Sequence, residues 1–352
     1  MPPDCQRIDG ILKMKQTLRL LAEKTLSWLP CSRLLQLCNQ QILCVYYHRF
    51  QLQPTDYFRG GYSVKSPQQF ETELRMLLDR FEPVSLQHLL PGASAQRPST
   101  KKPRLFLSFD DGYRELFDFA APVLKRLKVP ATVFITTRLL NNQQWLFEDE
   151  IGLLLHHLAR LSAVQQRECQ NRCLSQFGVS VAGLRSVRRR PDDVLDWLWN
   201  YLQLSAAAEL TRYQPYLTDT MVSSMLHQGI TVGAHGKSHT LISSLTPAQQ
   251  DAEITESTAF LAERFALPYR VFAFPYGEFE LPRQTLQRVL DGGKVDLLFG
   301  TRGVIRDEFH PRLLQRVWAE NHSGTLSQHL QQSLAAAALR TIRGTNCVSR
   351  TA

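Results

Sequence analysis

The sequence lacks the long apolar runs that would place it inside a membrane. Hydrophobic residues make up 43% of its 352 residues, but no stretch reaches the roughly 18 apolar residues that a transmembrane helix needs. The N-terminus also lacks the unbroken apolar core and small-residue cleavage site of a secretory signal, because charged residues interrupt it between positions 13 and 24. We therefore expect a cytoplasmic protein.

Paired cysteine motifs are absent as well. The seven cysteines form an odd set without CxxC spacing, at positions 5, 31, 38, 44, 169, 173 and 347. This arrangement indicates neither a disulfide framework nor a zinc ribbon, and reduced thiols are the expected state.

Positive charge is in surplus, but mainly at the two ends of the chain. The formal net charge is +9; residues 1–50 contribute +4 from seven basic and three acidic residues, and residues 331–352 contribute +3 from three arginines. The middle of the chain therefore holds only +2. This distribution argues against a basic groove for nucleic acid across the body of the protein.

The N-terminal segment has the pattern of an amphipathic helix. Apolar residues recur near one face of residues 11–29, with lysines between them: Ile11, Met14, Leu18, Leu21 and Leu29. Such a helix can lie on an anionic membrane surface, which would give peripheral contact with the inner face of the membrane. A helix packed against the rest of the protein explains the same pattern and is the favoured interpretation.

Further along the chain, short apolar segments rich in β-formers alternate with amphipathic helices. The pattern predicts strands at 42–47, 104–109, 133–135, 231–234 and 271–274, and helices at 67–80, from about 113 to 127, 219–228 and 247–265. This alternation predicts an α/β fold. A helical stretch at 146–217 interrupts it and is interpreted as an insertion.

This organisation predicts three parts of the chain. They are an N-terminal basic, amphipathic helical segment (1–41), a catalytic domain with the insertion (42–330), and a C-terminal helix and tail (331–352). The tail after about residue 344 is expected to be disordered.

Polar motifs follow the ends of three predicted strands: Asp110-Asp111-Gly112, His235 with His239, and Pro275-Tyr276-Gly277. In a barrel of parallel strands these ends meet on one face. Two histidines four apart on one helical turn can reach a single ion, and an aspartate completes a His-His-Asp set with open positions. Of the adjacent acids, Asp111 can bind the metal while Asp110 accepts a proton from water. A helix-capping acid or a surface histidine explains one of these residues but not the whole set.

The same motifs resemble those of a known family. Ser108-Phe-Asp-Asp-Gly112, His235-Gly-Lys-Ser-His239 and Phe274-Pro-Tyr-Gly277 are similar to the TFDDG, HxxxH and PYG motifs of the polysaccharide deacetylases with the NodB-homology fold, also called carbohydrate esterase family four. The resemblance spans roughly residues 42–320, apart from the insertion. It implies a distorted (β/α) barrel with a helical insertion and hydrolysis of an N-acyl group, in first place N-acetyl, from an amino sugar in a polysaccharide or glycan precursor.

The resemblance also implies a role for individual residues. Asp110 would be the general base, while Asp111, His235 and His239 would bind a divalent metal, for which Zn²⁺ is expected. The backbone N–H of Tyr276 would help to stabilise the oxyanion.

Two positions depart from the family pattern. Ala273 stands where the family has an arginine that pairs with the base, and Arg316 and Arg302 are candidate substitutes. The late general-acid histidine has no clear counterpart, although His310, His322 and His329 are present. In a permuted branch, that of the exopolysaccharide poly-N-acetylglucosamine deacetylases, this histidine comes from an early YH motif, which Tyr47-His48 resembles. His48 is therefore the predicted general acid.

Two other functions stay open. A catalytically inactive glycan-binding or scaffold protein of the same fold would explain the missing arginine at position 273. An amidase that acts on a small or lipid-linked substrate would suit the absent export signal and the basic termini. The tryptophans of the insertion region (Trp145, Trp197 and Trp199) could stack on sugars, but core packing is favoured, and His156, His157 and His227 are interpreted as helix-surface residues.

Overall fold

The computed structural model describes residues 20–51, 64–93, 102–187, 190–307, 311–320 and 324–350. Part of the predicted N-terminal helix (11–19), Cys5, His310 and His322 lie outside these residues.

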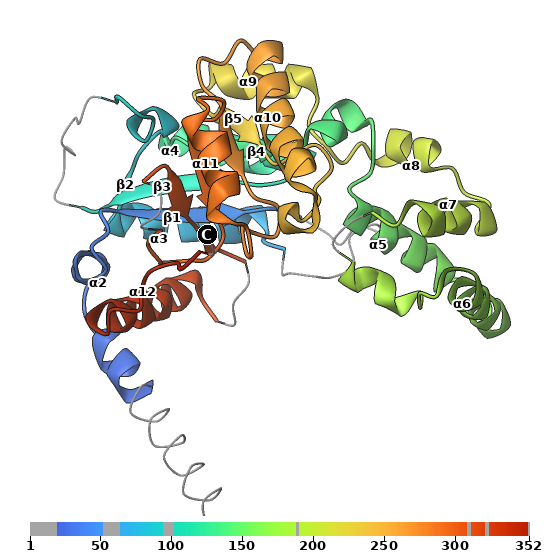
Figure 1. Ribbon diagram of the computed structural model, residues 1–352, viewed down its shortest axis with the longest axis horizontal. Helices are drawn as coiled ribbons and strands as arrows, with labels where there is room; N and C mark the ends of the chain where they lie inside the picture. Colours follow the sequence, from blue (N-terminus) through green and yellow to red (C-terminus); the bar gives the residue numbers. More distant parts are fainter. Residues whose placement is uncertain are drawn as a thin grey trace, which may run out of the picture.

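One parallel sheet curls into a nearly closed barrel (Figure 1). Its strands are β1 (Ile42–Tyr47), β2 (Glu82–Pro83), β3 (Arg104–Phe109), β4 (Thr132–Ile135), β5 (Thr231–Ala234), β6 (Val271–Ala273), β7 (Leu297–Gly300), β8 (Leu313–Gln315) and β9 (Val317–Trp318). They are ordered β8-β7-β6-β5-β4-β3-β1-β9, with β2 beside the start of β3. Only Arg316 separates β8 from β9, yet β8 pairs with β7 and β9 pairs with β1. This single segment therefore joins the two edges of the sheet, and the predicted distorted (β/α) barrel is confirmed.

Helices cover the outside of the barrel, as the sequence predicts. They are α2 (Cys31–Leu37), α3 (Pro67–Arg80), α4 (Ala121–Leu127), α9 (Asp219–His227), α10 (Pro247–Arg264), α11 (Arg283–Asp291) and α12 (Leu326–Ile342). In α3 the Ser66 side chain accepts from Gln69 N–H in a capping box, and Pro67 occupies the first turn, where its missing N–H costs nothing. A π-helical segment (Leu116–Ala120) precedes α4.

The predicted insertion forms a group of helices on one side of the barrel (Figure 1). They are α5 (Phe147–Leu158), α6 (Ala163–Phe177), α7 (Asp192–Tyr201) and α8 (Ala206–Tyr213). Trp145 and Trp199 are buried in a hydrophobic cluster that belongs to these helices, and Trp197 stacks on Tyr201. These contacts agree with core packing as the role of the tryptophans.

The C-terminal prediction needs correction. Helix α12 begins at Leu326, before the predicted boundary at 331, and the chain stays ordered to residue 350. Arg350 donates to Asp307 at 2.6 Å and lies 3.4 Å from Glu278, and Val348 is buried. The prediction of a disordered tail is therefore wrong for residues 344–350, because tertiary ion pairs that local composition does not reveal anchor this segment.

The described part of the N-terminal segment packs with one face and exposes the other. Residues 20–26 are helical, and Leu26 packs against the main core. The following helix α2 lies against α12, where Gln331 donates to the carbonyls of Ser27 and Leu29 at 2.9 and 2.5 Å. On the other side Leu21 and Trp28 are 56% and 84% exposed. Within the described ranges no helix combines the length and apolarity needed to cross a membrane, and the cysteines there are free thiols.

Candidate active site and metal centre

The predicted site residues gather at the carboxyl ends of the strands. Asp110 follows β3 directly and His48 follows β1, and because Tyr47 pairs with Phe109 in parallel register, these two residues leave the sheet side by side. His235 follows β5, and Pro275 lies just beyond β6. In parallel α/β barrels this rim is where reactive groups collect.

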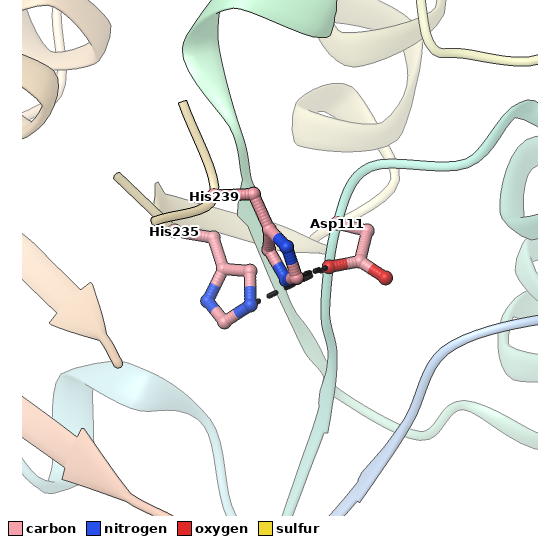
Figure 2. A group of neighbouring side chains, drawn as sticks. All are labelled: Asp111, His235 and His239. Atoms are coloured by element: carbon pink, nitrogen blue, oxygen red, sulfur yellow. Dashed lines mark ion pairs between the residues drawn. The ribbon is translucent and has the colours of Figure 1, made fainter. Parts of the chain in front are cut away.

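Asp111, His235 and His239 converge on one point (Figure 2). Oδ1 of Asp111 lies 3.4 Å from Nε2 of His235 and 3.3 Å from Nε2 of His239, and the three candidate ligand atoms lie within 4.8 Å of one another. All three residues are buried. Oδ1 of Asp111 has no hydrogen-bond partner among the described residues, and a buried carboxylate oxygen without a partner is costly. The set therefore fits a divalent cation.

Hydrogen bonds on the far side of each imidazole orient the two histidines. Nδ1 of His235 donates to the carbonyl of Ala273 at 2.9 Å, and Nδ1 of His239 donates to Oε1 of Glu148 at 3.1 Å. Each ring therefore points its Nε2 atom toward Asp111, the orientation that metal-binding histidines adopt. Burial lowers the pKa of His235 to about 4, so its imidazole is neutral, as a ligand must be.

The loop that carries the histidines is not helical, so the prediction of one helical turn is wrong. Gly236 and His239 have positive φ angles of 81° and 53°. The carboxylate of Glu253 accepts from the backbone N–H groups of Lys237 and Ser238 at 2.7 and 2.8 Å. This capped loop brings the imidazoles together by backbone reversal, which the four-residue spacing alone does not distinguish from a helix.

The turn after β3 also needs left-handed backbone. Asp111 has a φ of +72° and Gly112 a φ of +90°, and a Cβ atom at position 112 would lie 3.2 Å from Ile135. Glycine is thus required at 112, whereas the strained angle at Asp111 aims its carboxylate at the histidines.

Arg316 is the arginine that pairs with Asp110. Its guanidinium makes a bidentate contact, with Nη1 2.6 Å from Oδ1 and Nη2 2.9 Å from Oδ2. Both side chains are buried, with exposures of 0% and 2%. The other candidate, Arg302, lies 2.8 Å from Glu278 instead. The residue in the break between β8 and β9 therefore supplies the positive charge that position 273 lacks.

His48 pairs with the buried Glu320 at the same rim. Its Nδ1 donates to Oε2 of Glu320 at 2.6 Å, and the same carboxylate accepts from the backbone N–H groups of His48 and Arg49. Burial opposes the charged imidazole, but the Glu320 carboxylate outweighs it and raises the pKa of His48. The Glu320 carboxylate thus favours the protonated form of the His48 imidazole. His329 lies on α12.

Tyr276 lies against the metal cluster. Its φ is +58°, the next residue Gly277 has a φ of +128°, and a Cβ atom at 277 would lie 2.4 Å from the Phe279 ring. The Tyr276 ring centroid is 4.8 Å from that of His239, and the Tyr276 hydroxyl donates to Glu148. Sequence reasoning missed Glu148, because an acidic residue in the first turn of a helix is common.

Comparison with known proteins finds one matching family model and several similar solved structures. The family model described as polysaccharide deacetylase matches residues 97–291, which is more than half of the chain. A deacetylase from Streptococcus pyogenes solved with acetate is 15% identical, with a TM-score of 0.52, covering 83% of this chain and 97% of that one.

Two other solved structures are similar. IcaB from Ammonifex degensii is 18% identical, with a TM-score of 0.50, covering 84% of this chain and 97% of its own. A polysaccharide deacetylase from Bacillus cereus is 14% identical, with a TM-score of 0.52, covering 84% of this chain and 69% of that one. The search of curated proteins returned no match. At these identities the structural likenesses establish the fold alone.

Proposed function

The chain belongs to the polysaccharide deacetylase family, hydrolases of non-peptide carbon–nitrogen bonds, and from this premise we propose that it removes an N-acetyl group from an amino sugar in a polysaccharide or glycan precursor. The observation that carries the proposal is the buried pair of Asp110 and Arg316 beside the Asp111, His235 and His239 cluster. A glycan-binding scaffold would need neither a buried base nor a metal site. The missing arginine at 273 no longer favours that alternative, since Arg316 pairs with Asp110.

Asp111, His235 and His239 would hold the metal, and Zn²⁺ suits two imidazoles and one carboxylate. A bound divalent ion polarises the acyl carbonyl and makes water more acidic. Asp110 takes the proton from the attacking water, and Arg316 fixes both oxygens of its carboxylate and balances its charge.

Two further groups complete the hydrolysis. The backbone N–H of Tyr276 stabilises the negative charge that develops on the carbonyl oxygen. His48, held at Nδ1 by Glu320, donates its Nε2 proton to the nitrogen of the leaving amine as the carbon–nitrogen bond breaks. The products are acetate and the free amino sugar.

The test combines metal content with acetate release from N-acetylglucosamine oligomers. Asp110→Asn should keep the metal and lose acetate release, whereas His235→Ala should lose both. Wild-type protein that releases acetate equally well after complete metal removal would contradict the proposed metal centre. Bound metal without acetate release from any oligomer would contradict this substrate and direct the search to another acyl group or a lipid-linked sugar.

We also propose peripheral contact with anionic lipid, because one stripe of the N-terminal helix faces solvent. Leu21, Lys24 and Thr25 of the helix and Trp28 in the turn that follows it are exposed, while Leu26 packs inward. Exposed tryptophan and leucine beside lysine are typical of helices that lie in the interface of an anionic membrane. Contact of this kind would suit the alternative in which the substrate is a lipid-linked sugar.

Flotation with vesicles that contain anionic lipid tests this contact. Replacing Leu21 and Trp28 by serine should weaken binding about tenfold or more, from the loss of two large apolar side chains. Phe260→Ser is the matched control, since Phe260 is 41% exposed on α10, which lies away from α12 in Figure 1. Equal flotation of the double variant and the wild type would contradict the proposal.

A further inference from the structure

A carboxylate from the helical insertion reaches the metal cluster. Glu148 lies in the first turn of α5, and its Oε1 is 3.1 Å from Nδ1 of His239. The same oxygen accepts the hydroxyl hydrogen of Tyr276. One atom of the insertion therefore contacts both a candidate metal ligand and the loop that carries the oxyanion donor.

The neighbouring acids of α5 have partners outside the metal cluster. Oδ2 of Asp149 accepts from the Tyr216 hydroxyl at 3.0 Å, and its Oδ1 lies 3.5 Å from Arg49, which follows β1. The carboxylate of Glu150 accepts from Arg190 at 2.8 Å and from the indole of Trp199 at 2.7 Å. Because successive residues of a helix point about 100° apart, the three acids reach three different partners. Asp149 ties the helix start to the barrel, and Glu150 ties it to the insertion.

We propose that Glu148 is a positioning residue of the metal centre, and that the helical insertion is in this way a working part of the deacetylase site; this inference rests on the proposed function. By accepting from Nδ1, the carboxylate fixes the tautomer in which Nε2 of His239 is the ligand, and it makes that nitrogen more basic. Nδ1 of His235, by contrast, donates to a neutral acceptor, the carbonyl of Ala273. A charged acceptor makes the stronger hydrogen bond, so the imidazole that the insertion contacts, that of His239, is the more strongly held of the two.

Contact with Tyr276 extends the effect of Glu148 to the turn that carries the proposed oxyanion donor. The hydroxyl is tied to Glu148 and the ring lies against His239. The backbone N–H of the same residue belongs to the turn at Pro275 to Gly277, in which the Gly277 N–H donates to the Pro275 carbonyl at 2.6 Å. Loss of Glu148 should therefore affect metal affinity and turnover together.

Zn²⁺ affinity of the full-length chain, measured by competition with a chromophoric chelator, tests the inference without any substrate. Glu148→Gln should weaken Zn²⁺ binding about 10- to 100-fold, as removal of carboxylate partners of metal-bound histidines does. Glu148→Ala should weaken it more, because glutamine keeps a neutral acceptor. Glu150→Gln is the matched control from the same helical turn, and we expect its Zn²⁺ affinity to equal that of the wild type.

Thermal unfolding of the metal-free proteins separates positioning from stability. Glu150 is buried and paired, so Glu150→Gln should lower the melting temperature, whereas the half-buried Glu148 should change it little. Unchanged Zn²⁺ affinity in Glu148→Gln, or an equal loss in both variants, would overturn the inference. Either result could occur with full acetate release by the wild type, which leaves the proposed function standing. A wild type that binds no Zn²⁺ would instead count against the metal centre itself.

Discussion

Replacing Arg316 by methionine should destabilise the protein strongly. The guanidinium and the Asp110 carboxylate form a bidentate pair at 2.6 and 2.9 Å with exposures of 0% and 2%. Removing one member of a buried pair leaves an uncompensated charge and costs about 3–5 kcal/mol. This loss is a large part of the roughly 5–15 kcal/mol by which whole domains are stable. Divided by the urea m-value of a protein of this size, it should lower the urea midpoint by roughly 1–2 M.

A double-mutant cycle separates the pair from other effects of the substitutions. Asp110→Asn also leaves a buried charge without its partner, whereas the double variant removes both charges. Its loss of stability should therefore be smaller than the sum of the single losses by at least about 2 kcal/mol. Additive losses would refute the pairing, since they would mean that Arg316 and Asp110 do not interact.

Activity gives a second, independent readout. In Arg316→Lys the lysine keeps the positive charge but cannot make the bidentate contact with both oxygens of Asp110. The base should then be misplaced, and kcat should fall about 10- to 100-fold. The matched control is Arg302→Lys, because Arg302 pairs with Glu278; its kcat should stay within about twofold of the wild type. A greater loss in the Arg302 variant would mean that the wrong arginine has been assigned to the base.

Three further predictions concern pH and metal. Burial raises the pKa of Asp149 from 3.8 to about 7, so its contribution to stability is fully present below about pH 4 and is lost as pH rises through 7. Between pH 4 and pH 8 the wild type should therefore lose on the order of 4 kcal/mol relative to Asp149→Asn in denaturant titrations; parallel profiles would contradict this. Glu320 raises the pKa of His48, so Glu320→Gln should move the basic limb of the kcat profile to lower pH, and an unmoved limb would exclude His48 as the acid. Removing Zn²⁺ from protein held at a 100-fold excess over its dissociation constant should lower the melting temperature by about 3–4 °C in calorimetry, and no shift would argue against a metal.

The sequence predicted those parts of the fold and site that depend on local pattern. Strands such as β1 and β3 read as apolar runs because parallel strands are buried on both faces. The helix predicted at 67–80 agrees with α3, which begins at Pro67 after the N-cap Ser66. Residues placed directly after strands, such as Asp110 and Asp111, could then be assigned to one rim of a barrel.

Long-range closure could not be predicted in that way. Two arginines were candidates for the pairing with Asp110, and only the position of Arg316 between β8 and β9, 206 residues from Asp110, decides between them. Glu148 was missed for a related reason, since its partner His239 lies 91 residues away. The geometry of the histidine loop depends on Glu253, on a separate helix, and on two positive φ angles.

Pairing of charges at the rim explains why these long-range contacts belong together. Asp110 is balanced by Arg316, and the charged form of His48 is balanced by Glu320. A buried charge without a partner costs folding free energy. Each member of these two pairs therefore fixes the position of the other. Neither pair leaves a surplus charge for the metal cluster to neutralise.

The metal cluster differs from these pairs in its charge. Asp111 and Glu148 bring two negative charges to the two imidazoles, and Oδ1 of Asp111 has no hydrogen-bond partner among the residues that the structure describes. Burial lowers the pKa of His239, but the Glu148 and Asp111 carboxylates outweigh it and raise that pKa. Metal binding requires both imidazoles to be neutral, and in that state two negative charges remain without compensation. One divalent cation would balance both, and a monovalent ion would not. The insertion, by bringing Glu148 to His239, thus contributes half of the charge that selects the ion.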